Sequence, residues 1–200
     1  MTTQQAMAAD RQIQVSPAPG DLEVVRAFVN TLDIEEGTDD FAAPEGLSRW
    51  LAEHGLATVA MVSDADLADA VALREALRGV LREHAGHPGG PGSLGDVGGR
   101  PGAIAPIAAA LPVRLEVEDG GTIAVVAAAS GVQGALARLL LIAAAASGNG
   151  TWTRLKACAA DDCQWAFYDR SPTRNGRWCS MSICGSRAKS RAYRRRAQQS

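Results

Sequence analysis

The residues best suited to chemistry are four cysteines in the last quarter of this 200-residue chain. They are Cys158, Cys163, Cys179 and Cys184, spaced C-x4-C-x15-C-x4-C. Two close pairs are thus separated by an insert long enough to fold the second pair back onto the first. Four thiolates that converge in this way suit a tetrahedral zinc ion. Because four cysteines fill the coordination sphere, they predict a structural site and leave no open position for catalysis.

Other interpretations of the cysteines compete with zinc. Two disulfides would need an oxidising compartment, but the N-terminal MTTQQAMAADRQIQ lacks the apolar core of a secretory signal. A redox pair would more often be C-x-x-C, and four unrelated buried cysteines would not cluster so tightly. The sequence therefore favours one structural Zn²⁺ per chain and a cytoplasmic location, where thiols stay reduced.

The cysteine segment is poor in large apolar side chains. From residue 158 to the end these are Trp165, Phe167, Tyr168, Trp178, Met181, Ile183 and Tyr193. A core this small rarely folds stably without a cross-link such as a disulfide or a bound metal ion. We therefore expect this module to fold only when it binds zinc.

Charge is divided unevenly along the chain, whose net charge is −2. Residues 151–200 carry eleven Lys or Arg against three acids, a net +8, so the first 150 residues carry −10. Such a split predicts a module that faces a polyanion, attached to an acidic body.

The positive charge gathers on a helix predicted to start near Ser186. Arginines recur there at i, i+4, i+7 and i+8 and form one face, and the insert between the cysteine pairs adds further positive charge. The alternative is a solvated basic tail whose charge also offsets a four-thiolate zinc site. Beside a zinc module we favour nucleic acid. The candidate contacts are Arg174, Arg177, Arg187, Lys189, Arg191, Arg194, Arg195 and Arg196.

The first 150 residues predict a mainly helical domain with one β-hairpin, so the fold class is α+β. Residues 1–20 suggest a flexible leader, 21–150 the larger domain and 151–200 the zinc finger, two knuckles followed by a helix. Helices are expected from Asp21, from Pro44 to Gly55, and from the N-cap Ser63 to Gly86. Residues 87–102 form a Gly/Pro-rich loop without the Gly-Lys-Ser/Thr ending of a phosphate loop.

After this loop, VRLEVEDGGTIAVVAAA alternates apolar residues around a Glu-Asp-Gly-Gly turn, which predicts the hairpin. The following GVQGALARLLLIAAAASG predicts a mostly buried helix. The apolar region 123–146 is a poor membrane span, because Arg138 lies inside it and much of it is alanine. No membrane partner is expected.

Arg74 is the one polar residue of the larger domain that stands out. On the predicted helix of residues 63–86 it falls inside the apolar arc, where a charge needs a partner. One interpretation is an internal pair with an acid or with helix-end carbonyls. The other is a pocket in which Arg74 anchors a small anionic ligand.

The cysteine segment closely resembles a known family. RLKACAADDCQWAFYDRSPTRNGRWCSMSICGSRAKSRAYRRR is similar to the CGNR zinc finger, in which a cysteine pair precedes FYD-S and then R-WCSM--CGNR-K---YR-R. The four cysteines fall on the family's metal positions. Ser186 departs from the usual asparagine, which is not a ligand. Other matching positions are Trp178, Met181, Gly185, Arg187, Lys189, Tyr193 and Arg194.

The larger domain resembles the ABATE domain, the partner of that finger. FVNTLD, WLAEHGL and LREALRGVLREHA are similar to its recurring segments, so the resemblance covers nearly the whole chain. It implies a stress-linked transcriptional regulator of a kind found largely in actinobacteria. Asn30 and Thr31 match the family's NT pair, which predicts either a helix-end cap or a contact to the second module.

Together these features predict a zinc-dependent DNA-binding transcriptional regulator that responds to stress or to a ligand. The runner-up is an interaction module that binds protein or RNA. A homodimer is compatible with either. An enzyme is not expected, because no Ser/His/Asp set, phosphate loop or open metal site is visible.

Overall fold

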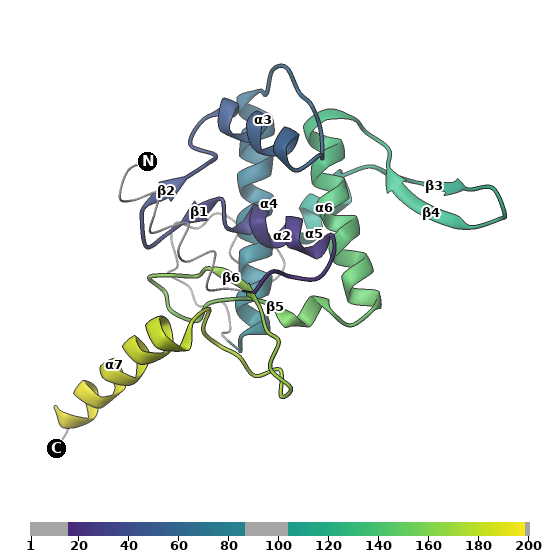
Figure 1. The fold of residues 1–200 in the computed structure, drawn as a ribbon. Helices are drawn as coiled ribbons and strands as arrows, with labels where there is room; N and C mark the ends of the chain where they lie inside the picture. Colours follow the sequence, from purple (N-terminus) through teal and green to yellow (C-terminus); the bar gives the residue numbers. More distant parts are fainter. Residues whose placement is uncertain (1–15, 87–103, 199–200) are drawn as a thin grey trace.

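The computed structural model describes residues 16–86 and 104–198 (Figure 1). The predicted Gly/Pro-rich loop at 87–102 and most of the predicted leader lie outside the described residues. The larger domain contains helices α2 (Leu22–Val29), α3 (Pro44–Glu53), α4 (Asp64–His84), α5 (Ile104–Ala110) and α6 (Gly131–Gly148).

The longest helix, α4, begins and ends where its sequence predicts. The Ser63 hydroxyl accepts from the Asp66 N–H, and the Asp66 carboxylate accepts from the Ser63 N–H. This reciprocal capping box satisfies two N–H groups that the first helical turn leaves free. At the other end Gly86 has φ +75°, a left-handed conformation that glycine adopts without strain.

The core lies between α2, α3, α4 and α6 (Figure 1). Its aromatic centre is formed by Phe28, whose ring centroid lies 5.6 Å from Phe41 and 5.4 Å from Trp50. Leucines of α4 and α6 complete it, among them the fully buried Leu77 and Leu136. Tilted aromatic pairs and close-packed leucines of this kind are worth several kcal/mol to a small domain.

Helix α6 is long and apolar enough to cross a membrane by length and composition. Val132, Leu136 and Leu139 are buried in the shared core, and α6 packs against α2, α4 and β4. The helix therefore has the packing of a central core helix.

The predicted hairpin is present as β3 (Val113–Val117) and β4 (Ile123–Ala127), with Leu115 opposite Val125. Its alternating pattern had predicted strands, but both faces of β3 are exposed and the hairpin projects from the body (Figure 1). Two shorter strands, β1 (Leu32–Asp33) and β2 (Thr38–Asp39), form a second antiparallel pair.

The C-terminal part contains a 3₁₀ turn (Trp152–Arg154), strands β5 (Leu155–Ala157) and β6 (Ala166–Tyr168), a π-helical turn η2 (Met181–Gly185) and helix α7 (Ser186–Ala197). Strand β5 packs against α4 and β6 against α2, and Leu155, Ala157 and Ala166 belong to the core of the larger domain. The first half of the cysteine segment is thus built into the larger domain, and the α+β fold class is confirmed.

Candidate metal centre and basic helix

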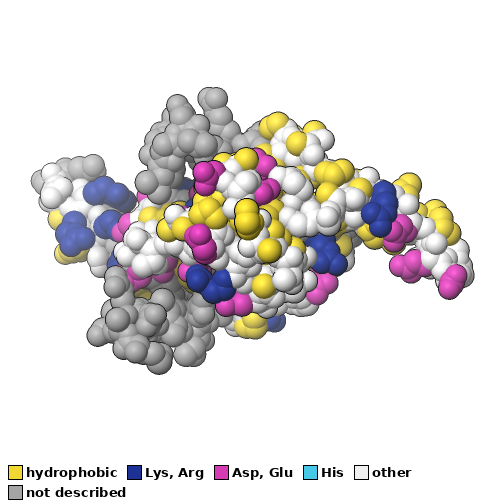
Figure 2. Space-filling model, turned by 90° about the horizontal axis from the view of Figure 1, so that it is seen from above, with side chains coloured by type: hydrophobic (Ala, Val, Ile, Leu, Met, Phe, Trp, Pro, Cys, Tyr) yellow, Lys and Arg dark blue, Asp and Glu magenta, His cyan; other side chains and the backbone are white. Residues whose placement is uncertain are grey.

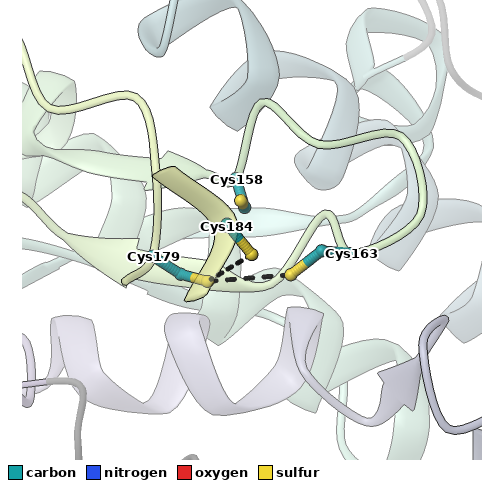
Figure 3. Close-up of side chains that lie close together, drawn as sticks. All are labelled: Cys158, Cys163, Cys179 and Cys184. Atoms are coloured by element: carbon teal, nitrogen blue, oxygen red, sulfur yellow. Dashed lines mark hydrogen bonds between the residues drawn. The ribbon is translucent and has the colours of Figure 1, made fainter. Parts of the chain in front are cut away.

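The four cysteines converge on one point (Figure 3). Their Sγ atoms all lie within 4.8 Å of one another, with 3.6 Å between Cys163 and Cys179 and 3.7 Å between Cys179 and Cys184. All four thiols are free, so the disulfide alternative is not realised. Tetrahedral zinc with Zn–S bonds of about 2.3 Å separates its sulfurs by about 3.8 Å. The cluster therefore already has the dimensions of a four-thiolate zinc site.

The first cysteine pair stands on a tight turn after β5. The N–H groups of Cys163 and Gln164 both donate to the Ala160 carbonyl at 3.0 Å, which closes the turn, and Gln164 adopts φ +51° to leave it. Cys158 and Cys163 are buried, so this turn presents both sulfurs inward.

In the second pair, Cys179 precedes η2 and Cys184 lies within it, and the Ser180 hydroxyl at the start of η2 accepts from the Ile183 N–H. A Cβ on Gly185 would lie 3.0 Å from the Met181 methyl carbon and 3.5 Å from Trp178, so a glycine permits this packing. Ser186, which replaces the asparagine usual in the resembling family, donates to the Met181 carbonyl at 3.2 Å. Helix α7 begins at this residue, directly after the second knuckle.

Hydrogen bonds among the four thiols shift their pKa values in opposite directions. Hydrogen bonding with the other three thiols, Cys163 foremost, lowers the pKa of Cys158, and the hydrogen bond with Cys158 raises the pKa of Cys179. Four thiolates this close repel one another, so a divalent cation is what allows all four to ionise together. Three of the four cysteines are buried and Cys179 is half-buried. Four thiolate ligands fill the tetrahedral sphere of a zinc ion, as in structural sites.

The insert between the cysteine pairs is held by a buried ion pair. Lys156 Nζ donates to Asp169 at 2.7 Å and also to the carbonyls of Arg174 and Gly176. Asp169 accepts from the N–H groups of Ser171 and Gly176. Burial would raise the pKa of Asp169, but hydrogen bonds from Lys156 and Ser171 hold it below its usual range. The insert is thereby shaped around one carboxylate.

Replacing Asp169 with asparagine is expected to lower the free energy of unfolding by about 3 kcal/mol, because it leaves Lys156 buried without its counter-ion. Since the folded carboxyl has the lowered pKa, this stabilisation is complete at pH 7 and is lost as the pH falls below 3.8. Urea unfolding at pH 7 measures the change. The exposed Asp119→Asn serves as the control, and equal stability of the two variants would contradict the assignment.

The predicted basic residues are all exposed or half-buried, but they do not form one free stripe. Arg187 donates to Glu35 at 2.7 Å and Arg191 to Asp162 at 3.2 Å, so the first turns of α7 rest on acids of the body and of the first knuckle. Farther along, Lys189, Arg194 and Arg195 are exposed, and the structure gives their side chains no hydrogen-bond partner among the described residues. The remaining positions are Arg196, on α7, and Arg174 and Arg177, on the insert.

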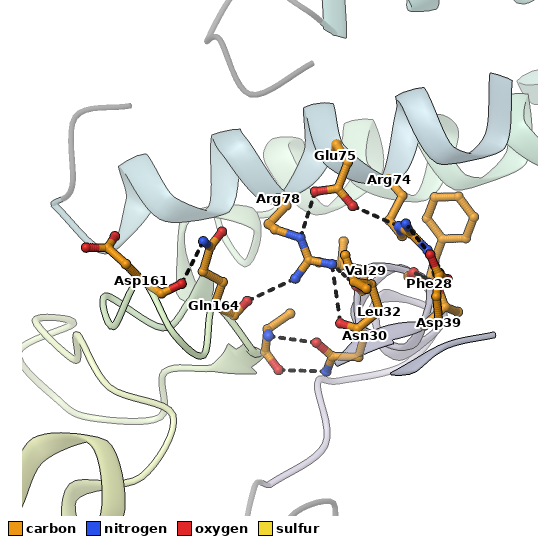
Figure 4. A network of polar contacts seen from close by, with 12 residues as sticks. Phe28, Val29, Asn30, Leu32, Asp39, Arg74, Glu75, Arg78, Asp161 and Gln164 are labelled. Atoms are coloured by element: carbon orange, nitrogen blue, oxygen red, sulfur yellow. Dashed lines mark hydrogen bonds and ion pairs between the residues drawn. The ribbon is translucent and has the colours of Figure 1, made fainter. Parts of the chain in front are cut away.

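Two arginines of α4 hold the cysteine segment to the body, and Figure 4 shows the first of them, Arg78. Arg78, 2 % exposed, donates to the Gln164 carbonyl at 3.2 Å and to the Val29 carbonyl at 2.7 Å. One helical turn on, Arg82 pairs with Asp161 at 2.7 Å. Sequence reasoning missed both residues. Arg74, Arg78 and Arg82 recur every four residues, and this spacing indicates that they share one face of the helix.

Asn30 makes the most specific contact between the two parts. Its side-chain amide accepts from the Ala166 N–H at 2.7 Å and donates to the Ala166 carbonyl at 3.0 Å (Figure 4). Thr31 donates to the Phe28 carbonyl, at the end of α2. Both alternatives left open for this pair are therefore realised: one residue contacts the second module and the other caps a helix.

Arg74 is bound internally. Its guanidinium forms two hydrogen bonds to Asp39, at 2.6 and 2.9 Å, and one to Glu75 at 2.8 Å. This is the internal pair that the sequence offered as one interpretation. The role of Arg74 in binding an anionic ligand stays a prediction.

Comparison with protein families supports the two-part architecture. Residues 154–197 match the CGNR zinc finger, and residues 22–151 match the ABATE domain, described as "putative stress-induced transcription regulator". A search of curated proteins found no match. The four cysteines are the ligands that the finger needs for one structural zinc ion. The chain belongs to the ABATE family and carries a C-terminal CGNR zinc finger.

Proposed function

We propose that this protein is a cytoplasmic DNA-binding transcriptional regulator in which the zinc centre positions α7 on DNA. The observation that carries the proposal is the composition and placement of α7: it has six Lys or Arg and no acid over Ser186–Ala197, and none of its residues is buried. It projects from the body directly after the last cysteine (Figure 1). A basic helix of this kind fits the phosphate backbone or the major groove.

The pairing of α7 with the body supports a division of labour along the helix. Arg187 and Arg191 pair with acids at its base and orient it, while Lys189, Arg194 and Arg195 stay available for phosphates. Basic side chains gather at this end of the molecule in Figure 2. The outer part of α7 is therefore assigned the DNA contacts, and its base the positioning.

The double variant Arg194→Ala/Arg195→Ala is expected to weaken duplex binding strongly at low salt. It should also reduce the slope of log affinity against log salt by about 2, since each lost phosphate contact removes about 0.9. Fluorescence anisotropy with a mixed-sequence duplex, from low to physiological salt, measures both quantities. Arg49→Ala, an exposed arginine of α3, is the matched control.

Two outcomes would count against the proposal. Wild-type protein with full zinc that shows no duplex affinity at low salt would reject it outright. Tighter binding to single-stranded RNA than to the duplex, lost in the same double variant, would support the RNA-binding alternative instead.

A further inference from the structure

The β3–β4 hairpin exposes an apolar face that nothing in the described structure covers. The exposed fractions are 70 % for Leu115, 72 % for Val117 and 67 % for Ile123. Because side chains alternate along a strand, these residues share one face, which we call the hairpin apolar face. Its members are Val113, Leu115, Val117, Ile123 and Val125. Apolar side chains gathered on a protruding ribbon commonly mark an interaction surface.

The outer edge of β3 is also free to pair. Glu118 donates to Thr122 and Ala128 to Pro112, so these are hydrogen-bonded pairs of the β3–β4 ladder. Along an antiparallel ladder, hydrogen-bonded pairs alternate with pairs whose backbone groups point away from the partner strand. The backbone groups of Val113, Leu115 and Val117 therefore point away from β4, and among the described residues no third strand meets them. On the other side β4 packs against α6.

The charges on the hairpin indicate which kinds of partner it can bind. Its far half carries Glu116, Glu118 and Asp119, against the single Arg114 (Figure 2, right). A net negative ribbon disfavours nucleic acid and anionic membranes. An open strand edge with β-branched side chains and no guarding charge on its apolar face favours another strand.

We propose that this partner strand is β3 of a second copy, paired antiparallel about a two-fold axis through Leu115. In this register Leu115 lies opposite itself and Val113 lies opposite Val117 of the second copy. Each of these residues directs its N–H and C=O outward, so all three pairs can be hydrogen-bonded pairs. On the other face Arg114 lies opposite Glu116 of the second copy, and Glu116 opposite Arg114. The edge is thus complementary to itself in shape, hydrogen bonding and charge.

Neighbouring two-fold registers lack this complementarity. An axis through Arg114 or through Glu116 places like charges directly opposite each other, which destabilises a strand pair. An axis through Val117 places Glu116 opposite Glu118. The register centred on Leu115 is the one that pairs opposite charges, and it also keeps every apolar residue of β3 on one face. The inference is independent of DNA binding.

The test exchanges the charges at positions 114 and 116 and measures the oligomeric state by sedimentation velocity. It uses the full, zinc-loaded chain. Wild type is expected to sediment as a dimer. Arg114→Glu and Glu116→Arg, each alone, place four like charges together and should weaken dimerisation about tenfold or more. Mixed in equal amounts, they should form a heterodimer, because each Glu then meets an Arg. The Arg114–Glu116 pair within a chain stays broken in the mixture, so recovery reports only the contact between chains.

Leu115→Lys tests the apolar centre, since it places two lysines opposite each other on the axis. It should give a monomer whose circular dichroism spectrum and zinc content match wild type, because the side chain is exposed. Met61→Lys, at an apolar position of the body that is also exposed, should leave the dimer intact. A wild-type monomer at every accessible concentration would overturn the proposal, as would single charge variants that dimerise normally or a mixture that stays monomeric.

Discussion

Replacing Cys158 with serine is expected to reduce zinc from one ion per chain to nearly none and to unfold the finger. Cys158 is fully buried and directly follows β5, so its sulfur joins the metal to the most firmly packed part of the finger. Serine ligates zinc poorly, and a structural zinc site contributes about 10–16 kcal/mol to the folding of a finger peptide. Metal analysis of reduced protein measures the zinc, and far-UV circular dichroism measures the loss of α7.

The same variant should also lower the stability of the larger domain. Strand β5 covers α4, β6 covers α2, and the two strands supply Leu155 and Ala166 to the main core, so an unfolded finger uncovers apolar surface there. Chelation of zinc from wild type should give the same drop in melting temperature. The exposed Ser190→Ala on α7 is the control. If Cys158→Ser retained full zinc, the four-cysteine assignment would be wrong.

Arg78→Leu is expected to lower the free energy of unfolding by about 3–5 kcal/mol. The guanidinium is buried and donates to carbonyls of both parts of the chain, while Glu75 balances its charge at 3.0 Å. Leucine fills part of the space, but it leaves those carbonyls without this donor and removes one of the two arginines that pair with Glu75. Urea denaturation with the zinc occupancy held equal measures the loss.

Arg49→Leu provides the matched comparison for this result. Arg49 is exposed, so the same change of side chain there should alter stability by less than about 0.5 kcal/mol. Asn30→Ala removes the neighbouring contact to Ala166, and the two variants should be non-additive, because both act on the edge of the finger. An Arg78→Leu protein as stable as wild type would show that the buried cation does not hold the two parts together.

Local patterns were sufficient for the long helices, for the β3–β4 hairpin and for the metal centre, but they did not predict α5 or the short β1–β2 pair. Ser63 and Asp66 predict the start of α4 because a capping box acts over three residues. The cysteine spacing predicts the zinc ligands because each pair lies on one turn of chain. In the capping box and within each cysteine pair the interacting groups are close in sequence, so the local pattern contains that interaction.

Contacts between distant segments could not be obtained in the same way. Periodicity placed Arg74 in the apolar arc, but its partner Asp39 lies 35 residues away on β2. The basic stripe was predicted correctly as a helix, yet Arg187 meets Glu35 of the body, and a helical wheel contains no information on that neighbour. The hairpin alternates as a half-buried strand does, although its apolar face is uncovered among the described residues. Alternation indicates which residues share a face and does not indicate what covers that face.

The contacts of Asn30 and of the α4 arginines determine which zinc fingers could replace this one in a chimera. Asn30 recognises backbone atoms only, so it would accept a finger of different sequence whose β6 follows the same path. The arginines of α4 are less tolerant, since Arg82 requires an acid at position 161. A chimera that exchanges fingers between relatives should therefore carry residues 74–82 with the finger. A finger cut out alone would expose Leu155, Ala157 and Ala166, and we expect it to aggregate.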